Sequence, residues 1–154
     1  MYYTLLVIHS AVRWLVLISL LFAIFRGYRG WKTNQSFSPF DNLVRHITAT
    51  IAQIQLILGL ILYTLSPIVA YFFDNFKEAI HERQIRFFGM EHITVMFVAI
   101  VLITLGSIKA KRQTTDQAKF KTMAIWYTIA LLAILSSVPW QFSPLVSRPY
   151  FRSL

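Results

Sequence analysis

The sequence predicts an all-α integral membrane protein, an up-down-up-down bundle of four transmembrane helices. First, 56% of its 154 residues are hydrophobic and only 14% are charged, whereas soluble domains are about 45–50% apolar and about 25% charged. Second, four apolar runs reach the roughly 20 residues that a membrane-spanning helix needs. Third, the basic residues gather in short loops between these runs, as they do in multi-pass membrane proteins.

The predicted spans cover about residues 3–25, 43–65, 87–108 and 120–140, and together they form a single membrane domain over residues 1–154. They are too long and too apolar for strands, and a bilayer admits only helices or closed barrels. Short connections make consecutive helices antiparallel neighbours. The chain has no basic region before its first apolar run and no small-residue cleavage site after it. We therefore expect this segment to remain as the first span rather than to be removed as a signal peptide.

The loops predict the orientation. The first loop is basic, with Arg26, Arg29 and Lys32. The third loop is also basic, and its cations are Lys109, Lys111, Arg112, Lys119 and Lys121. In the second loop, acidic and basic residues balance. Because cytoplasmic loops carry the excess of Lys and Arg, we expect a bacterial inner-membrane protein with both termini on the outer, periplasmic side.

Three local features are expected from capping and turn signals. Asp41 or Asn42 is expected to cap the second helix. In the connector of residues 68–85, Asn75 precedes Glu78 by three residues, which predicts a capping box and a helix from that point. If that helix continued into the third span, His81 and His92 would share a face, and Gly89 would be a point of kinking. Pro139, Pro144 and Pro149 predict an extended tail.

Two histidines are the main candidates for a functional site. His9 lies about six residues into the first span and His92 about five into the third, so at ~1.5 Å per residue their depths agree within a few Å. Two imidazoles on two helices at one level are what bis-histidine ligation of a b-type heme requires. Another metal or redox role, or hydrogen bonding between helices, would also place histidines here.

Three residues near these histidines are candidates for the same site. Arg13 lies one turn deeper than His9 and needs a partner, because charges inside a membrane are costly. Glu91 is the only acidic residue within a predicted span, so an Arg13–Glu91 ion pair would fix the helix register and orient His92. A heme propionate is the other candidate partner of Arg13. Met96, one turn beyond His92, is either an alternative axial ligand or part of the pocket wall.

The second span carries a polar stripe. His46, Thr50 and Gln53 share one face at i, i+4 and i+7, while Gln55 lies off that face. We expect both glutamines to hydrogen-bond across helices. His46 is expected near the cytoplasmic surface, beside a lipid or quinone headgroup. Because the fourth span lacks histidine, a second heme of the same type has no obvious ligand pair.

Other site chemistry is largely excluded. The chain has no cysteine, which removes disulfides, thiolate zinc sites, iron–sulfur clusters and c-type heme attachment. The net charge of +9 lies in membrane loops rather than on a soluble basic face, so nucleic-acid binding is not expected. His81, with Glu78 and Glu82 nearby, is a candidate for a metal site at the outer surface.

Two short motifs carry a resemblance to known proteins. The segment Leu6-Val-Ile-His9-Ser10-Ala-Val-Arg13-Trp14 and the later Glu91-His92-Ile-Thr-Val-Met96 resemble small four-helix bacterial membrane proteins described as cytochrome b-like. This resemblance spans most of the chain in layout, and it implies one heme b bound by His9 and His92. A more distant likeness to small four-helix membrane protoporphyrinogen oxidases rests on the early histidine alone, and their activity is not transferred.

The expected function is that of a b-type cytochrome in electron transfer between the quinone pool and an outer-face partner. His9 and His92 would be axial ligands, and Arg13 and Glu91 would orient a ligand or neutralise a propionate. The alternative is a non-catalytic accessory subunit of a larger membrane complex. A third possibility is a membrane oxidoreductase for a lipid-soluble substrate. Expected partners are membrane lipids, with a quinone, other membrane subunits or a second copy as further candidates.

Overall fold

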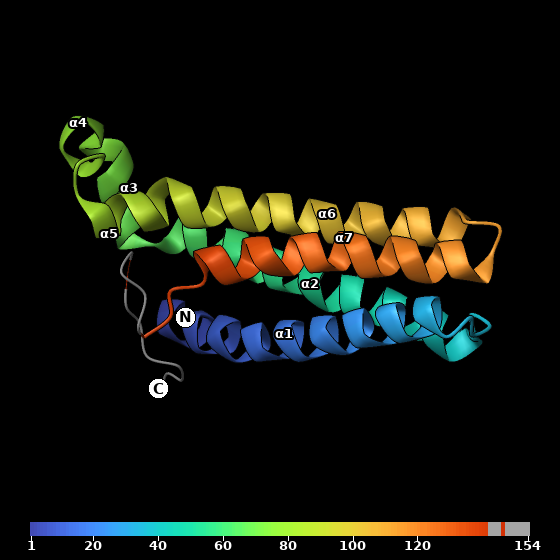
Figure 1. Ribbon diagram of the computed structural model, residues 1–154. Helices are drawn as coiled ribbons and strands as arrows, with labels where there is room; N and C mark the ends of the chain where they lie inside the picture. Colours follow the sequence, from blue (N-terminus) through green and yellow to red (C-terminus); the bar gives the residue numbers. More distant parts are fainter. Residues whose placement is uncertain (142–145, 147–154) are drawn as a thin grey trace.

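Four long helices form an antiparallel bundle in the computed structural model, which describes residues 1–141 and 146 (Figure 1). The long elements are α1 (Tyr2–Lys32), α2 (Pro39–Leu65), α6 (His92–Arg112) and α7 (Asp116–Ser137). All four are long and apolar enough to cross a membrane, α6 together with the short helical segments before it. The protein is therefore a multi-pass membrane protein with the predicted all-α bundle fold.

The helices pack in a cyclic order. α1 lies against α2 and α7, and α6 lies against the same two neighbours, so α1 and α6 face each other across the diagonal of the bundle. The α1–α2 and α6–α7 connections lie at one end, while the N-terminus and the short helices between α2 and α6 lie at the other (Figure 1). We call the first the basic end, because Lys and Arg gather there, and the second the cavity end, because a cavity lies there.

The helices extend beyond the predicted spans. α1 continues to Lys32 and α2 begins at Pro39, because polar residues at the membrane surface continue a helix as readily as apolar ones. The cap of α2 is Ser38, whose hydroxyl accepts from the Asp41 backbone N–H at 3.2 Å, while Ser38 N–H donates to the Asp41 carboxylate at 3.0 Å. The expectation that Asp41 or Asn42 is the cap is wrong: Asp41 is the third residue of a capping box.

The connector between α2 and α6 is broken into short helices. They are α3 (Pro67–Asp74), α4 (Phe76–Ala79) and α5 (Arg83–Arg86). A helix does begin after Asn75, but the predicted capping box is absent there, since the Asn75 amide donates to the Tyr71 carbonyl at 3.3 Å.

The chain turns at residues 80–82 before α5 begins. Consequently no continuous helix joins His81 to His92, so the condition under which they would share a helical face is not met. His81 is exposed on the turn. Of the expected tail, Pro144 and Pro149 lie outside the described residues.

The basic end is closely packed. Gly30 faces the ring of Phe120 and Gly106 faces Trp126, so these helices approach more closely than a Cβ atom would allow, and Gly27 packs tightly against Ala124. Arg26 links the end of α1 to Asp41 at the start of α2 with an N–O distance of 2.5 Å.

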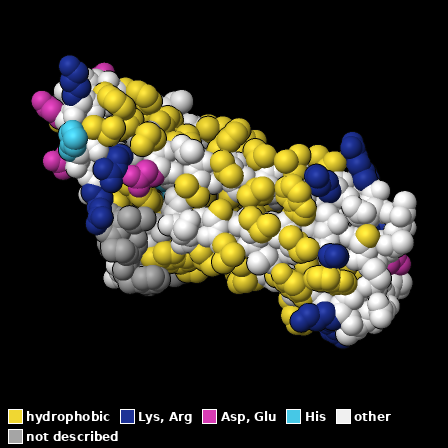
Figure 2. Space-filling view, turned by 45° about the horizontal axis from the view of Figure 1, so that its top comes forward, with side chains coloured by type: hydrophobic (Ala, Val, Ile, Leu, Met, Phe, Trp, Pro, Cys, Tyr) yellow, Lys and Arg dark blue, Asp and Glu magenta, His cyan; other side chains and the backbone are white. Residues whose placement is uncertain are grey.

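The outer surface matches the predicted membrane setting. Figure 2 shows an apolar band along the bundle, with Lys and Arg at one end and a mixture of acidic, basic and histidine side chains at the other. Many large apolar side chains on the long helices are exposed, such as Ile18, Leu132 and Phe97, at 63%, 62% and 52%. Exposure of this kind is costly in water and ordinary in lipid.

Candidate functional site

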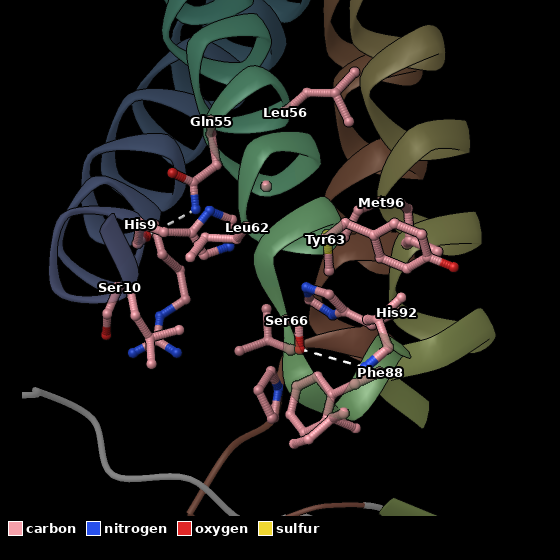
Figure 3. Close-up of a pocket in the computed structure, with 18 of the residues that line it drawn as sticks. His9, Ser10, Gln55, Leu56, Leu62, Tyr63, Ser66, Phe88, His92 and Met96 are labelled. Atoms are coloured by element: carbon pink, nitrogen blue, oxygen red, sulfur yellow. Dashed lines mark hydrogen bonds between the residues drawn. The ribbon is translucent and has the colours of Figure 1, made fainter. Parts of the chain in front are cut away.

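A cavity of about 340 Å³ lies inside the cavity end of the bundle, bordered by all four long helices. Its walls are mainly apolar. His9 and Arg13 from α1 and His92 and Met96 from α6 all line it, so four of the five predicted site residues meet in one place. Figure 3 shows His9 and Gln55 on one side of this space and His92 and Met96 on the other. The two imidazoles thus approach it from diagonally opposed helices.

His9 lies against a glycine of α2. A Cβ atom on Gly59 would come within 3.2 Å of the His9 Cε1 atom, so the absent side chain leaves the space that the imidazole fills. Gln55, one turn before Gly59, donates from Nε2 to the His9 carbonyl at 2.9 Å. Within the described residues, the buried His9 Nδ1 and the Gln55 Oε1 have no hydrogen-bond partner.

His92 is held in a defined orientation. Its Nδ1 lies 2.8 Å from the Ser137 carbonyl oxygen at the end of α7. Because a carbonyl only accepts, Nδ1 must carry a proton, and in the neutral ring Nε2 then carries the lone pair. The rings of Phe87 and Phe88 lie beside the imidazole, with centroids 5.6 Å and 6.3 Å away. His92 therefore offers one basic nitrogen in a fixed direction.

A π-helical turn precedes His92. This turn, η1 (Phe87–Glu91), ends with the His92 backbone N–H bonded to the Phe87 carbonyl, five residues earlier. The Tyr63 hydroxyl of α2 donates to the Gly89 carbonyl at 2.5 Å, and Gly89 packs against the ring of Phe72. Gly89, where a kink was expected, lies within this π-turn, a form often found at functional sites.

Glu91 has a different partner from the one expected. Its carboxylate accepts from Arg86 Nε at 2.6 Å, and Arg86 also donates to the Ile80 carbonyl at 3.0 Å. The expected Arg13–Glu91 pair is therefore corrected to Arg86–Glu91. The reason is the π-turn, which places residues five apart, rather than four, above one another. Both side chains are about one-third exposed, and Glu91 is not among the residues that line the cavity.

Arg13 keeps its expected place. It lines the cavity one turn from His9, with its guanidinium carbon 5.3 Å from the centre of the Trp14 ring. Met96 lines the cavity one turn beyond His92. The other two histidines lie elsewhere: His46 is exposed on α2, and His81 is exposed outside the bundle. The part of the chain that the structure describes contains no group of three His, Cys, Asp or Glu side chains suited to a metal ion, so the candidate at His81 has no support.

Sequence reasoning missed three contributors to this site. Gly59 accommodates His9, the Ser137 carbonyl holds His92, and Tyr63 bonds the π-turn. They act through a missing side chain, a backbone carbonyl and an interfacial tyrosine, and none of these stands out in a sequence. The expected bond of Gln55 across helices is confirmed, because its amide donates to the His9 carbonyl.

Comparison with known proteins finds no matching family model, no matching curated protein and no matching solved structure. The function must therefore be argued from the cavity itself.

Proposed function

We propose that this protein is a b-type cytochrome of the bacterial inner membrane, with one heme held between His9 and His92. It would pass electrons between the quinone pool and a partner at the outer face. The observation that carries this proposal is the pair of imidazoles on diagonal helices that line one apolar cavity. The resemblance of the His9 and His92 motifs to cytochrome b-like proteins points the same way.

The cavity residues fit a heme in three respects. His92 donates its other ring N–H to a backbone carbonyl, as metal-ligating histidines usually do. His9 Nδ1 and Gln55 Oε1 are buried without partners among the described residues. Because buried polar atoms are normally hydrogen-bonded, a bound group in the cavity would account for both atoms. Arg13 offers a guanidinium that suits a propionate carboxylate.

The chain itself would contribute positioning and environment. A bound heme would supply one-electron chemistry, and the axial ligands would set its range of potential. The Ser137 carbonyl would hold the His92 ring and raise its basicity as a ligand. The apolar walls would keep water out and lower the local dielectric constant. Arg13 would favour a negative charge nearby and would thereby influence the reduction potential.

The proposed orientation follows from the charge distribution. The basic end carries Arg26, Arg29, Lys32 and the cations of the third loop, and positive loops favour the cytoplasm. The cavity end would then lie in the outer half of the membrane, close to a periplasmic redox partner. The mixed charges around α4 and α5 would face that partner (Figure 2).

The test is a visible absorption spectrum of the purified protein, oxidised and then reduced with dithionite. Four variants are compared with the wild type: His9→Ala and His92→Ala in the cavity, and His46→Ala and His81→Ala as matched controls at exposed positions. We expect a sharp reduced α-band that the first two substitutions abolish and the last two preserve.

Two outcomes would contradict the proposal. A colourless wild-type protein from heme-replete cells would remove the cytochrome and favour the accessory-subunit alternative. An α-band that survives both cavity substitutions would assign the heme to other ligands.

A further inference from the structure

The outward face of α2 carries a regular seam. Its residues are spaced alternately by four and three, the heptad spacing by which two helices pack along one stripe. They are His46, Thr50, Gln53, Ile57, Leu60 and Thr64. Five of the six are exposed, and Thr50 is half-buried. We call these six residues the α2 seam. A helix that packed against this face would contact these six residues along one stripe.

Gln53 is the unusual member of the seam. It lies near the middle of α2, which runs from Pro39 to Leu65, so it sits at the centre of the membrane. Its Nε2 donates to the Thr104 hydroxyl on α6 at 3.2 Å. No other hydrogen bond within the described residues reaches this exposed amide, which leaves one N–H and the carbonyl oxygen facing outward. Lipid chains supply no partner for either group.

The other polar side chains at depth in the seam do not share this problem. The Thr50 hydroxyl donates to the His46 carbonyl at 3.1 Å, and the Thr64 hydroxyl donates to the Ile61 carbonyl at 2.8 Å. Both are therefore satisfied within their own helix. On the opposite side of the bundle, the exposed residues Ile129 and Leu132 of α7 are apolar. Among these residues of α2 and α7, Gln53 alone carries unsatisfied polar groups.

We propose that the α2 seam is the interface of a homodimer, in which Gln53 hydrogen-bonds Gln53 of the second copy. A primary amide is self-complementary, because the N–H of each copy can donate to the carbonyl of the other. Two copies with the same membrane orientation are related by a two-fold axis along the membrane normal, which brings equal positions of one helix together. Ile57 and Leu60 pack beside the amide pair on each copy. This interface does not depend on the heme.

The absence of cysteine allows a direct test by disulfide cross-linking in membranes. Single cysteines are introduced at Ile57 and Leu60 in the seam, and at Ile129 and Leu132 on α7 as matched exposed controls. Copper phenanthroline serves as the oxidant that takes two electrons from each thiol pair. Because a disulfide requires Cα atoms about 4.4–6.8 Å apart, we expect linked dimers from Ile57→Cys or Leu60→Cys and only monomers from the controls.

A second measurement tests the role of the amide. Donor- and acceptor-labelled protein is mixed in phospholipid vesicles over a range of protein-to-lipid ratios, and energy transfer reports the dimer. Gln53→Leu should raise the dimer dissociation constant about tenfold, the effect of losing about 1.4 kcal/mol of interhelical hydrogen bonding. Gln53→Asn keeps a self-complementary amide and should retain most of the association.

Several outcomes would overturn the proposal. They are a monomer at every protein-to-lipid ratio, equal association of the wild type and Gln53→Leu, cross-links at α7 in place of the seam, and seam cysteines linked to a different protein. Circular dichroism and the visible spectrum check that each variant folds. Neither readout reports the dimer, so loss of the heme and loss of the dimer remain separable.

Discussion

The two ends of the bundle use the same four helices in opposite ways. At the basic end, glycines face aromatic rings and the helices touch. At the cavity end the helices border a partly open space of about 340 Å³, and buried nitrogen and oxygen atoms lack partners within the described residues. Close packing is the norm in proteins, and larger voids destabilise. The cavity end therefore stays open although close packing would be more stable, as is expected of a binding site.

Buried polar groups also differ between the two ends, because those at the basic end are hydrogen-bonded. Arg45 is 5% exposed at the basic end, and its guanidinium donates to the Ser107 carbonyl at 3.0 Å, to the Ser107 hydroxyl and to the Asn42 side chain at 2.9 Å. Tyr127, fully buried, donates its hydroxyl to the Arg45 carbonyl at 2.8 Å. Four hydrogen bonds from the Arg45 guanidinium and the one from Tyr127 join α2, α6 and α7 into one buried polar network, which we call the clamp.

Breaking the clamp should have the largest effect. Arg45→Met removes the donors and strands the buried Ser107 acceptors, so we expect the free energy of unfolding to fall by about 3 kcal/mol. Titration with sodium dodecyl sulfate in mixed micelles measures this quantity. Arg29→Met is the matched control, because Arg29 is exposed at the same end, and it should change stability by less than about 0.5 kcal/mol. Equal effects of the two substitutions would show that the clamp contributes nothing special.

Glycine substitutions at the two ends should separate stability from binding. A Cβ atom on Gly30 would come within 2.5 Å of the Phe120 ring, so Gly30→Ala should cost about 1–3 kcal/mol of stability. On Gly59 the Cβ atom would meet the His9 Cε1 atom at 3.2 Å, and the imidazole can move into the cavity. Gly59→Ala should therefore cost below about 1 kcal/mol, while it alters the absorption spectrum. A larger stability loss at Gly59 than at Gly30 would contradict the comparison.

An effect smaller than that of Arg45→Met is expected where Tyr63 of α2 bonds the π-turn. Tyr63→Phe deletes the hydroxyl that donates to the Gly89 carbonyl at 2.5 Å, and should cost about 1 kcal/mol. Because this contact lies three residues before His92, the reduced α-band or the midpoint potential should also shift. Tyr71→Phe, at a residue 44% exposed, is the control and should leave both unchanged. An unaltered spectrum in Tyr63→Phe would mean that the turn positions His92 without this hydrogen bond.

The fold was predictable because composition and run length determine it. Four apolar runs of sufficient length have few alternatives in a bilayer, and the shared depth of His9 and His92 follows from where each run begins. That depth match then brought both residues to one cavity. The sequence also indicated that Gln53 and Gln55 bond across helices, and the bonds to Thr104 and to the His9 carbonyl confirm it.

The rest depended on how each helix is rotated about its axis. α1 exposes Leu15 and Ile18 and buries Val16 and Leu17, so lipid-facing and core-facing positions are equally apolar and give no rotational signal. Membrane helices lack the polar outer face that reveals rotation in soluble proteins. The roles of Gly59 and the Ser137 carbonyl depend on this rotation and could not be predicted. The predicted ion-pair partner of Glu91 was wrong for a related reason, because no sequence signal predicted the π-turn.

The π-turn also changes which residues share a helical face before and after it. A five-residue backbone bond at η1 accommodates one more residue than a regular α-helix would in the same length. A helical wheel drawn across residues 83–112 is therefore out of phase by one residue, about 100°, for everything on one side of the turn. A homologue that is one residue shorter here would align correctly with a single gap inside 87–91. Its α6 would present the same outward face.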